Sequence, residues 1–203
     1  MTKRINGELY HKMKSDTCAK KGIKLLHVYE DDWHDKKDIV KSKLTYLLNK
    51  CKDKIYARKT KICAVSLEES KKFVEANCLD KYDDTSTHSL GLCVDSNKLI
   101  MLMTYAITTD KIEIKNCCSL HNICVVGGIS KLCKHIVEEL HIDKLQATVY
   151  NHLSNTNTVF DKLAFSEIAE YSPYVEIRQS EGSSYEVYNC GKRVYEIDNT
   201  ISR

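Results

Sequence analysis

The alternation of apolar periodicities from residue 62 onward constrains the fold of this chain more than any other feature of the sequence. Short runs rich in β-branched and apolar residues predict strands, and apolar residues recurring every three or four positions predict helices. Strands are expected over 62–65, 90–94, 99–105, 112–126, 145–150 and 171–197, and helices over 66–78, 128–140 and 155–163. The order β-α-β-β-β-α-β-α-β predicts an α/β fold with a mixed sheet and flanking helices.

Local signals fix several boundaries within this pattern. Ser66 with Glu69 forms a Ser-x-x-Glu capping box at the start of a helix, and residues 95–98 form a hairpin turn. The long apolar stretch 112–126 is expected to break near Asn116 or Leu120. Gly127-Gly128 opens the next helix, whose apolar stripe comprises Ile129, Leu132, Cys133, Ile136, Val137 and Leu140.

Residues 1–50 predict a small helix–strand–helix segment ahead of this body. A polar helix over 8–21 ends at Gly22, a buried strand follows over 23–29, and Asp35 is the expected N-cap of a helix over 36–50. Its apolar face comprises Ile39, Val40, Leu44, Leu47 and Leu48. Residues 51–61 then form a basic connector, so the predicted division is 1–50, 51–61 and 62–203.

The charge is unevenly distributed along the chain. Residues 1–62 carry 17 Lys/Arg against 8 Asp/Glu, a net of +9, and the remainder carries 14 against 20, a net of −6. A basic element beside an acidic body predicts contact with nucleic acid, and the alternative is a solvated lysine-rich surface. The residues expected to make this contact are Lys36, Lys37, Lys41, Lys43, Lys54, Arg58, Lys59 and Lys61.

The ten cysteines are interpreted through the expected location of the protein. No apolar run approaches the roughly 20 residues of a membrane span, and no apolar h-region follows the first residues, so we expect no membrane association and a cytoplasmic location. Thiols there stay reduced and pack as small hydrophobic groups. The alternative is zinc binding by a cluster with metal-ligand spacing, formed by Cys117, Cys118, His121, Cys124, Cys133 and His135. Packing is the preferred interpretation, and no metal is expected.

The acidic run Glu30-Asp31-Asp32, with His27 and His34 beside it, allows two interpretations. Clustered carboxylates suit a hard divalent cation. Consecutive carboxylates also solvate a loop before a helix N-terminus, where the helix dipole favours them. We prefer the second interpretation.

A strand that runs into a glycine turn and then a helix is the clearest candidate binding site. In Val126-Gly127-Gly128-Ile129-Ser130-Lys131, the backbone N–H groups at the helix start favour a phosphate or another anion, and Lys131 is expected to add charge. The alternative is a tight strand–helix corner with no ligand.

Two sets of passages resemble a known family. Residues 9–12, 21–33 and 39–44 resemble the distal part of the Vsr-like, PD-(D/E)XK-type nuclease domain of phage Hef-like homing endonucleases. The passages 90–92, 102–105, 126–132 and 160–165 resemble the domain that commonly follows it, which is similar to the GNAT acyltransferase fold and to phage Mom-type DNA modifiers.

The resemblance implies a GNAT-like domain over 62–203 that binds acetyl-CoA or another acyl-CoA at Val126 to Lys131. The family pattern Gln/Arg-x-x-Gly-x-Gly/Ala falls on Cys124, Gly127 and Ile129, so the second small position carries isoleucine. The tyrosine that serves the family as general acid falls on Phe160, which leaves Tyr150 and Tyr105 as weak catalytic candidates. The strand that would carry the metal-binding carboxylate of the nuclease is not among these residues, so no nuclease activity is expected.

These observations lead to one expected function and two alternatives. The first is a phage-type GNAT-fold protein with a degenerate homing-endonuclease segment, which contacts nucleic acid or a nucleic-acid-bound machine in the host cytoplasm and retains acyl-CoA binding. The second is an active acyl- or DNA-modifying transferase of GNAT or Mom type. The third is a non-catalytic protein that binds host transcription or defence machinery.

Overall fold

The computed structural model describes residues 7–95, 97–141, 143–154, 158–180 and 182–198. The chain forms two compact units, of which the first comprises Met1–Asp35 and Ala147–Ile197 and the second comprises Lys36–Gln146 and Asp198–Arg203. The first unit is therefore built from two stretches that are distant in sequence. The predicted division of the chain into domains at residues 51–61 stays a prediction.

The second unit contains the first strands of a large mixed sheet and a separate parallel pair of strands. Strands β2, β3, β4 and β5 are neighbours in this order, with antiparallel pairing throughout, and β7 follows β5 in the strand order. Strands β1 and β6 pair in parallel. The elements are α3 (Lys37–Leu47), β1 (Asp53–Tyr56), η1 (Ala57–Lys59), β2 (Lys61–Ala64), α4 (Leu67–Asn77), β3 (His88–Cys93), β4 (Leu99–Ile107), β5 (Ile112–Ser119), β6 (Ile123–Val126), α5 (Gly128–Leu140) and β7 (Lys144–Tyr150), which ends in the first unit.

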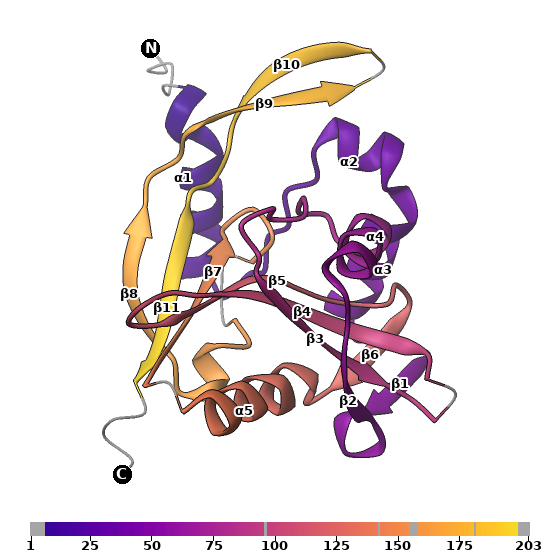
Figure 1. The fold of residues 1–203 in the computed structure, drawn as a ribbon. Helices are drawn as coiled ribbons and strands as arrows, with labels where there is room; N and C mark the ends of the chain where they lie inside the picture. The colour runs from indigo at the N-terminus through magenta and orange to yellow at the C-terminus, as the bar shows by residue number, and fades with distance from the viewer. Residues whose placement is uncertain (1–6, 96, 142, 155–157, 181, 199–203) are drawn as a thin grey trace, which may run out of the picture. The chain divides into compact units, whose positions relative to one another are not determined.

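Helices α4 and α5 lie on opposite faces of this sheet (Figure 1). Neighbouring cysteines of β5 show the two faces, because successive side chains of a strand point in opposite directions. Cys118 is hydrogen-bonded to Cys78 at the end of α4, whereas the Cys117 thiol lies near Cys133 of α5. The apolar side chains buried to less than 2% exposure in this unit are Val40, Val74, Leu92, Ile100, Leu102, Met103, Ile112, Leu132, Ile136 and Leu145. The predicted α/β class, with a mixed sheet and flanking helices, is confirmed.

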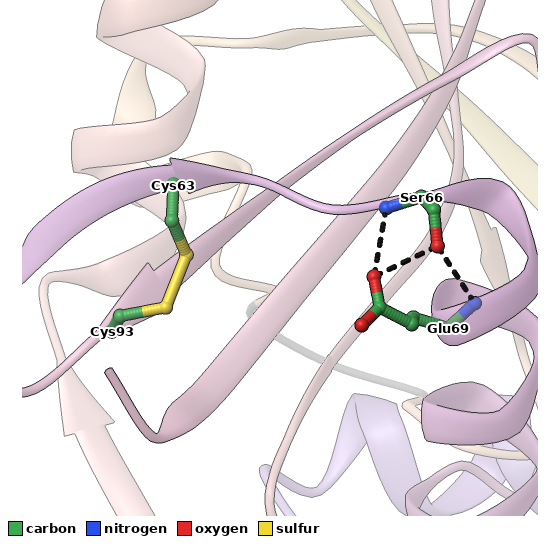
Figure 2. The surroundings of a disulfide bond; sticks show 4 residues. All are labelled: Cys63, Ser66, Glu69 and Cys93. Carbon is green, nitrogen blue, oxygen red and sulfur yellow. Dashed lines mark hydrogen bonds between the residues drawn. A yellow bond between two sulfur atoms is a disulfide. The ribbon is translucent and has the colours of Figure 1, made fainter. Parts of the chain in front are cut away.

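Three local predictions in this unit are confirmed. The Ser66 hydroxyl accepts a hydrogen bond from Glu69 N at 3.2 Å, while Ser66 N donates to Glu69 Oε2 at 3.2 Å, so the capping box starts α4 (Figure 2). Strands β3 and β4 form the expected hairpin. The stretch 112–126 breaks after β5, where Asn122 has a φ of 64° and its N–H donates to Ser42 Oγ at 2.7 Å.

The first unit combines α1 (Gly7–Lys20) and α2 (Glu30–Asp35) with strands from the end of the chain. Strand β11 (Lys192–Asp198) lies between β7 and β8 (Ser166–Tyr171) in the strand order and pairs antiparallel with β8, and β9 (Val175–Ser180) and β10 (Ser183–Tyr188) form a hairpin. Helix α1 ends as predicted at Gly22, which has a φ of 69°. Ile23 N donates to Cys18 O and Gly22 N donates to Ala19 O, the two hydrogen bonds of a Schellman motif.

The predicted strand over 23–29 is wrong. Ile23 is 51% exposed, and the segment belongs to no strand; its backbone bonds include those from Ile23 N to Cys18 O at 2.9 Å and from His27 N to His152 O at 3.0 Å. Apolar and β-branched composition favours extended backbone, but a strand also needs a neighbouring strand with a free edge. These residues connect α1 to α2 and bury only part of their side chains.

Asp35 was also expected to cap the following helix, and this is wrong. Residues 30–35 form α2, with three carboxylates in its first turn where the helix dipole favours them. The N-cap of α3 is Lys36, which makes no capping hydrogen bond with its side chain. The predicted helix over 155–163 is replaced by the short 3₁₀ helix η2 (Asp161–Leu163), and 155–157 lie outside the described residues. The expected connector, 51–61, contains β1 and η1.

The expectation that the cysteines are all reduced is corrected at one pair. Cys63 of β2 and Cys93 of β3 are joined by a disulfide (Figure 2). The pairing of β2 with β3 places Cys63 opposite Gly91, two positions from Cys93. Among the residues that the structure describes, no helix is both long and apolar enough to span a membrane.

Candidate functional site

The corner between β6 and α5 exposes the start of a helix. Gly127 is the N-cap with φ 78° and ψ 9°, a left-handed conformation that favours glycine. The first helical bond runs from Lys131 N to Gly127 O at 3.0 Å. The amides of Gly128, Ile129 and Ser130 precede it, and the first N–H groups of an α-helix have no partner within the helix. Gly127 and Ser130 are exposed, and anion binding at this corner stays a prediction.

Gly128 has a different role from that of Gly127. A Cβ atom at position 128 would lie 2.3 Å from Met101 Sδ and 2.9 Å from Val125 Cγ1, and the residue itself is buried. The backbone of α5 therefore begins in direct contact with β4. Gly128 sets this close packing of the helix on the sheet, whereas Gly127 makes the turn.

Lys131 does not provide the free charge that the sequence predicts. Its Nζ donates to Ala57 O at 3.0 Å and also to Thr60 O, so the ammonium group is held by backbone carbonyls of the η1 segment. Thr60 Oγ1 donates to Ala57 O as well, at 2.7 Å. Lys131 thus fixes η1 beside the first turn of α5.

Cationic side chains near the corner come from another part of the chain. The parallel pairing of β1 with β6 places Tyr56 opposite Val126, and η1 follows Tyr56 directly. Arg58 and Lys59 of η1 are exposed, and the Arg58 guanidinium lies 5.1 Å from the centre of the Tyr56 ring. The sequence assigned both residues to nucleic acid contact and gave no signal for a parallel β1–β6 pair, so their placement beside the corner was missed.

The basic residues expected to contact nucleic acid fall into two groups. Lys36 Nζ donates to Cys78 O at 3.0 Å and Leu79 O at 3.1 Å, so its ammonium group is hydrogen-bonded to backbone carbonyls at the end of α4. Lys37, Lys41 and Lys43 belong to α3, where Lys41 lies 3.9 Å from Asp38. The second group lies along consecutive elements from β1 to β2, and its members are all exposed. We call this group the basic stretch; it comprises Lys54, Arg58, Lys59 and Lys61.

The two tyrosines named as catalytic candidates belong to different parts of the chain. Tyr105 of β4 is 5% exposed and stacks on His88 with ring centroids 5.4 Å apart, and burial raises its pKa. Tyr150 ends β7 in the first unit, where its ring lies 5.8 Å from that of His152. Phe160 is buried between Phe165 and Tyr195, as a core residue would be.

Cys117 and Cys118 of the predicted cluster are neighbours in β5, and Cys118 is hydrogen-bonded to Cys78, which lies outside that cluster. Burial raises the pKa of Cys117, and burial raises the pKa of Cys133 to about 12. A hydrogen bond with Cys78, followed by burial, raises the pKa of Cys118. Across the described parts of the chain, no cluster of His, Cys, Asp and Glu has a geometry that could hold a metal ion.

The acidic run of α2 binds an arginine in the first unit. Arg178 Nε donates to Asp31 Oδ2 at 2.8 Å, and its NH2 nitrogen lies 2.8 Å from Asp32 Oδ1. Tyr185 donates its hydroxyl proton to Asp31 Oδ1 at 2.9 Å. Burial alone would raise the pKa of Asp31, but the hydrogen bonds from Arg178 and Tyr185 outweigh it, and the pKa lies below its ordinary value. These carboxylates thus have a cationic protein partner.

Comparison with known proteins gives similarity at the level of solved structures. No family model and no curated protein matches the sequence. The ribosomal-protein-S18-alanine N-acetyltransferase of Escherichia coli is 10% identical, with a TM-score of 0.48 over 68% of this chain and 93% of that one. A GNAT family acetyltransferase from Elizabethkingia anophelis, with acetyl-CoA bound, is 13% identical, with a TM-score of 0.47 over 69% and 98%. An acetyltransferase of Bacillus subtilis in complex with CoA is 14% identical, with a TM-score of 0.46 over 69% and 99%.

Proposed function

We propose that this protein is an acyl-CoA-binding protein of the GNAT-like type and that the β6–α5 corner binds the pyrophosphate of the acyl-CoA. The first-turn amides of Gly128, Ile129 and Ser130, which have no partner within the helix, and the exposed left-handed turn at Gly127 are the observation that carries the proposal. A pyrophosphate matches them because it accepts several N–H donors and complements the positive end of the helix dipole. Arg58 and Lys59 of η1 add positive charge beside the corner.

The residues present fit such a ligand in part. Gly127 has no side chain and no atom nearer than 3.8 Å to its Cβ position, so a phosphate can approach the backbone. Ile129 occupies a position where the GNAT pattern has a small residue, and its side chain is half-buried. When bound, an acyl-CoA supplies an acyl group activated as a thioester. Acyl transfer also needs an acid near the departing thiolate, and Phe160 provides none.

Replacing Ser130 with glutamate tests the anion site. Ser130 is exposed in the first turn of α5, where a carboxylate stabilises the helix, so the variant is expected to fold at least as stably as the parent. The same carboxylate repels a pyrophosphate at the amides. Like charges a few ångströms apart near a protein surface repel each other by a few kcal/mol, so the Kd for acetyl-CoA measured by calorimetry should rise at least tenfold.

Ser130→Gln is the matched control, because glutamine has nearly the same size and no charge. Its Kd for acetyl-CoA should stay within about threefold of the parent's, because glutamine adds no charge beside the pyrophosphate. A tenfold rise in Kd would correspond to a loss of 1.4 kcal/mol of binding free energy. Equal affinities of the parent and Ser130→Glu would contradict the site. Absence of binding by the parent, in a sample that unfolds cooperatively, would contradict acyl-CoA binding as a whole.

Contact with nucleic acid is a second candidate function, supported by the basic stretch. Its four cations are exposed within eight residues, and the Tyr56 ring, 46% exposed, lies under the Arg58 guanidinium. Cations bind phosphates, and an exposed aromatic ring with arginine stacks on unpaired bases. The combination favours a single strand over a duplex.

Binding of a single-stranded oligonucleotide should therefore depend steeply on salt. Four phosphate contacts predict a slope of log K against log salt of about −2.8 for a single strand. Arg58→Ala with Lys59→Ala removes two contacts and should reduce the slope to about −1.4 in fluorescence anisotropy. Lys134→Ala, an exposed lysine of α5 outside the basic stretch, should leave the slope unchanged. A slope that responds equally to both changes would contradict an interface at this stretch.

A further inference from the structure

The disulfide between Cys63 and Cys93 joins β2, the outermost strand of the large sheet, to its neighbour β3 (Figure 2). Strand β2 has four residues, stands at the end of the strand order and pairs with β3 alone. Cys63 is half-buried and Cys93 is 8% exposed, so Cys63 is the more exposed end of the disulfide. A short edge strand is also the part of a sheet that opens most easily.

The segment ahead of β2 is tied to the start of α5. Ala57 O and Thr60 O both accept hydrogen bonds from Lys131 Nζ, and both residues are 6% exposed. Upstream, Tyr56 pairs with Val126, the last residue before the corner. A displacement of β2 therefore acts on η1 and, through Lys131, on the first turn of α5.

Strand β3, which carries Cys93, also lies against the first turn of α5. Leu92, adjacent to Cys93, is fully buried, and its Cδ1 lies 3.4 Å from the Cβ position of Gly128. Each cysteine of the disulfide is thus separated by only a few residues from one that contacts the start of α5.

We propose that the Cys63–Cys93 disulfide is a redox latch that fixes β2 and η1 and that a dithiol reductant opens it. A thiolate of the dithiol attacks Cys63 Sγ and releases the Cys93 thiolate, which takes a proton. The second thiol of the reductant then displaces Cys63. The dithiol is oxidised to its own disulfide, and two thiols remain on the protein. Reduction lets β2 separate from β3 and weakens the support that η1 gives to Lys131.

Hydrogen exchange of the full chain tests the latch without any ligand, so its outcome is independent of acyl-CoA binding. Backbone amides of 57–64 should exchange at least tenfold faster after reduction with dithiothreitol, while those of β4 and β5 keep their rates. The melting temperature should fall by several degrees, because the bond closes a loop of about 30 residues. Air-oxidised, unfolded protein should alkylate at eight of the ten cysteines.

Two variants separate the latch from a general effect of the reductant. Cys63→Ala with Cys93→Ala should exchange quickly at 57–64 in both conditions, and Cys124→Ser should respond to reduction as the parent does. If the double variant does not fold, hydrogen exchange of the parent protein before and after reduction still tests the proposal. Ten alkylated cysteines in the oxidised sample, or equal exchange rates in the two redox states, would overturn the proposal.

Discussion

Alanine at position 191 is expected to lower the free energy of unfolding by about 3 kcal/mol. Gly191 has a φ of 76°, a conformation that costs a residue with a Cβ roughly 1–2 kcal/mol. The added Cβ would also lie 2.2 Å from Tyr171 O and 3.2 Å from Ser172 C. These are backbone atoms that cannot rotate away, and overpacking of this kind costs typically 1–3 kcal/mol more. Urea unfolding followed by circular dichroism measures the loss.

The turn around Gly191 is held from several sides, so it cannot relax to admit the methyl group. Gly191 N donates to Asn189 Oδ1 at 2.9 Å, and the same oxygen accepts from Tyr174 N at 3.1 Å. Asn151 N donates to Gly191 O at 3.0 Å. Asn189 itself is fully buried, and its Nδ2 donates to Glu176 Oε1 at 2.7 Å.

Gly182→Ala is the matched control for this prediction. Gly182 has nearly the same φ, 81°, but no atom lies within 4 Å of its Cβ position. Its substitution should therefore cost only the conformational part, about 1 kcal/mol. Equal losses at the two positions would show that contact with Tyr171 does not contribute.

Features of the fold that depend on neighbours in sequence were predictable. The Ser66–Glu69 capping box lies within four residues, and the apolar stripe of α5 repeats within one helix. Gly22 and Gly127 have left-handed conformations at the two helix ends where glycine was interpreted as a boundary. In each case the determining interaction is local, so the sequence pattern contains it.

Features that depend on distant segments were missed. Residues 23–29 have strand composition, yet whether they pair depends on a free strand edge elsewhere. The parallel β1–β6 pair joins segments 70 residues apart, as in Asp53 opposite Ile123, and no periodicity announces it. Arg178 lies 147 residues from Asp31, so the acidic run gave no sign of its partner.

In the candidate site, too, the features set by neighbours in sequence were predictable, and those set by distant segments were not. The glycine turn at Gly127 and the helix that starts after it follow from local sequence. The hydrogen bonds from Lys131 to carbonyls of the η1 segment and the packing of Gly128 against Met101 depend on tertiary contacts. For this reason a bulky residue at position 128 would disturb the sheet as well as any ligand, and Ser130 is the position at which the anion site can be tested alone.

Replacing Arg178 with methionine is expected to destabilise the protein by about 3–5 kcal/mol at pH 7, because it leaves buried carboxylates without their cation. The side chains of Asp31 and Asp32 are only 15% and 6% exposed, and both are in ion pairs with Arg178. The guanidinium also lies 4.1 Å from the centre of the Tyr29 ring, and methionine retains only the apolar part of that contact. Lys72→Met is the control, since its ion pair with Glu68 is exposed and contributes less than about 0.5 kcal/mol.

The pH dependence distinguishes loss of charge pairing from loss of packing. In the parent, the pKa of Asp31 lies below its ordinary value of 3.8, so its contribution to stability is present above pH 3.8 and disappears as the pH falls through the lowered pKa. Without Arg178, the hydrogen bond and the charge that lower the pKa of Asp31 are lost, so this pKa rises from its value in the parent and protonation relieves the penalty of burial as the pH falls. The difference in unfolding free energy between parent and Arg178→Met should therefore shrink from pH 7 to pH 4. A difference that stays constant over this range would mean that Arg178 stabilises the first unit through packing alone, because packing does not titrate.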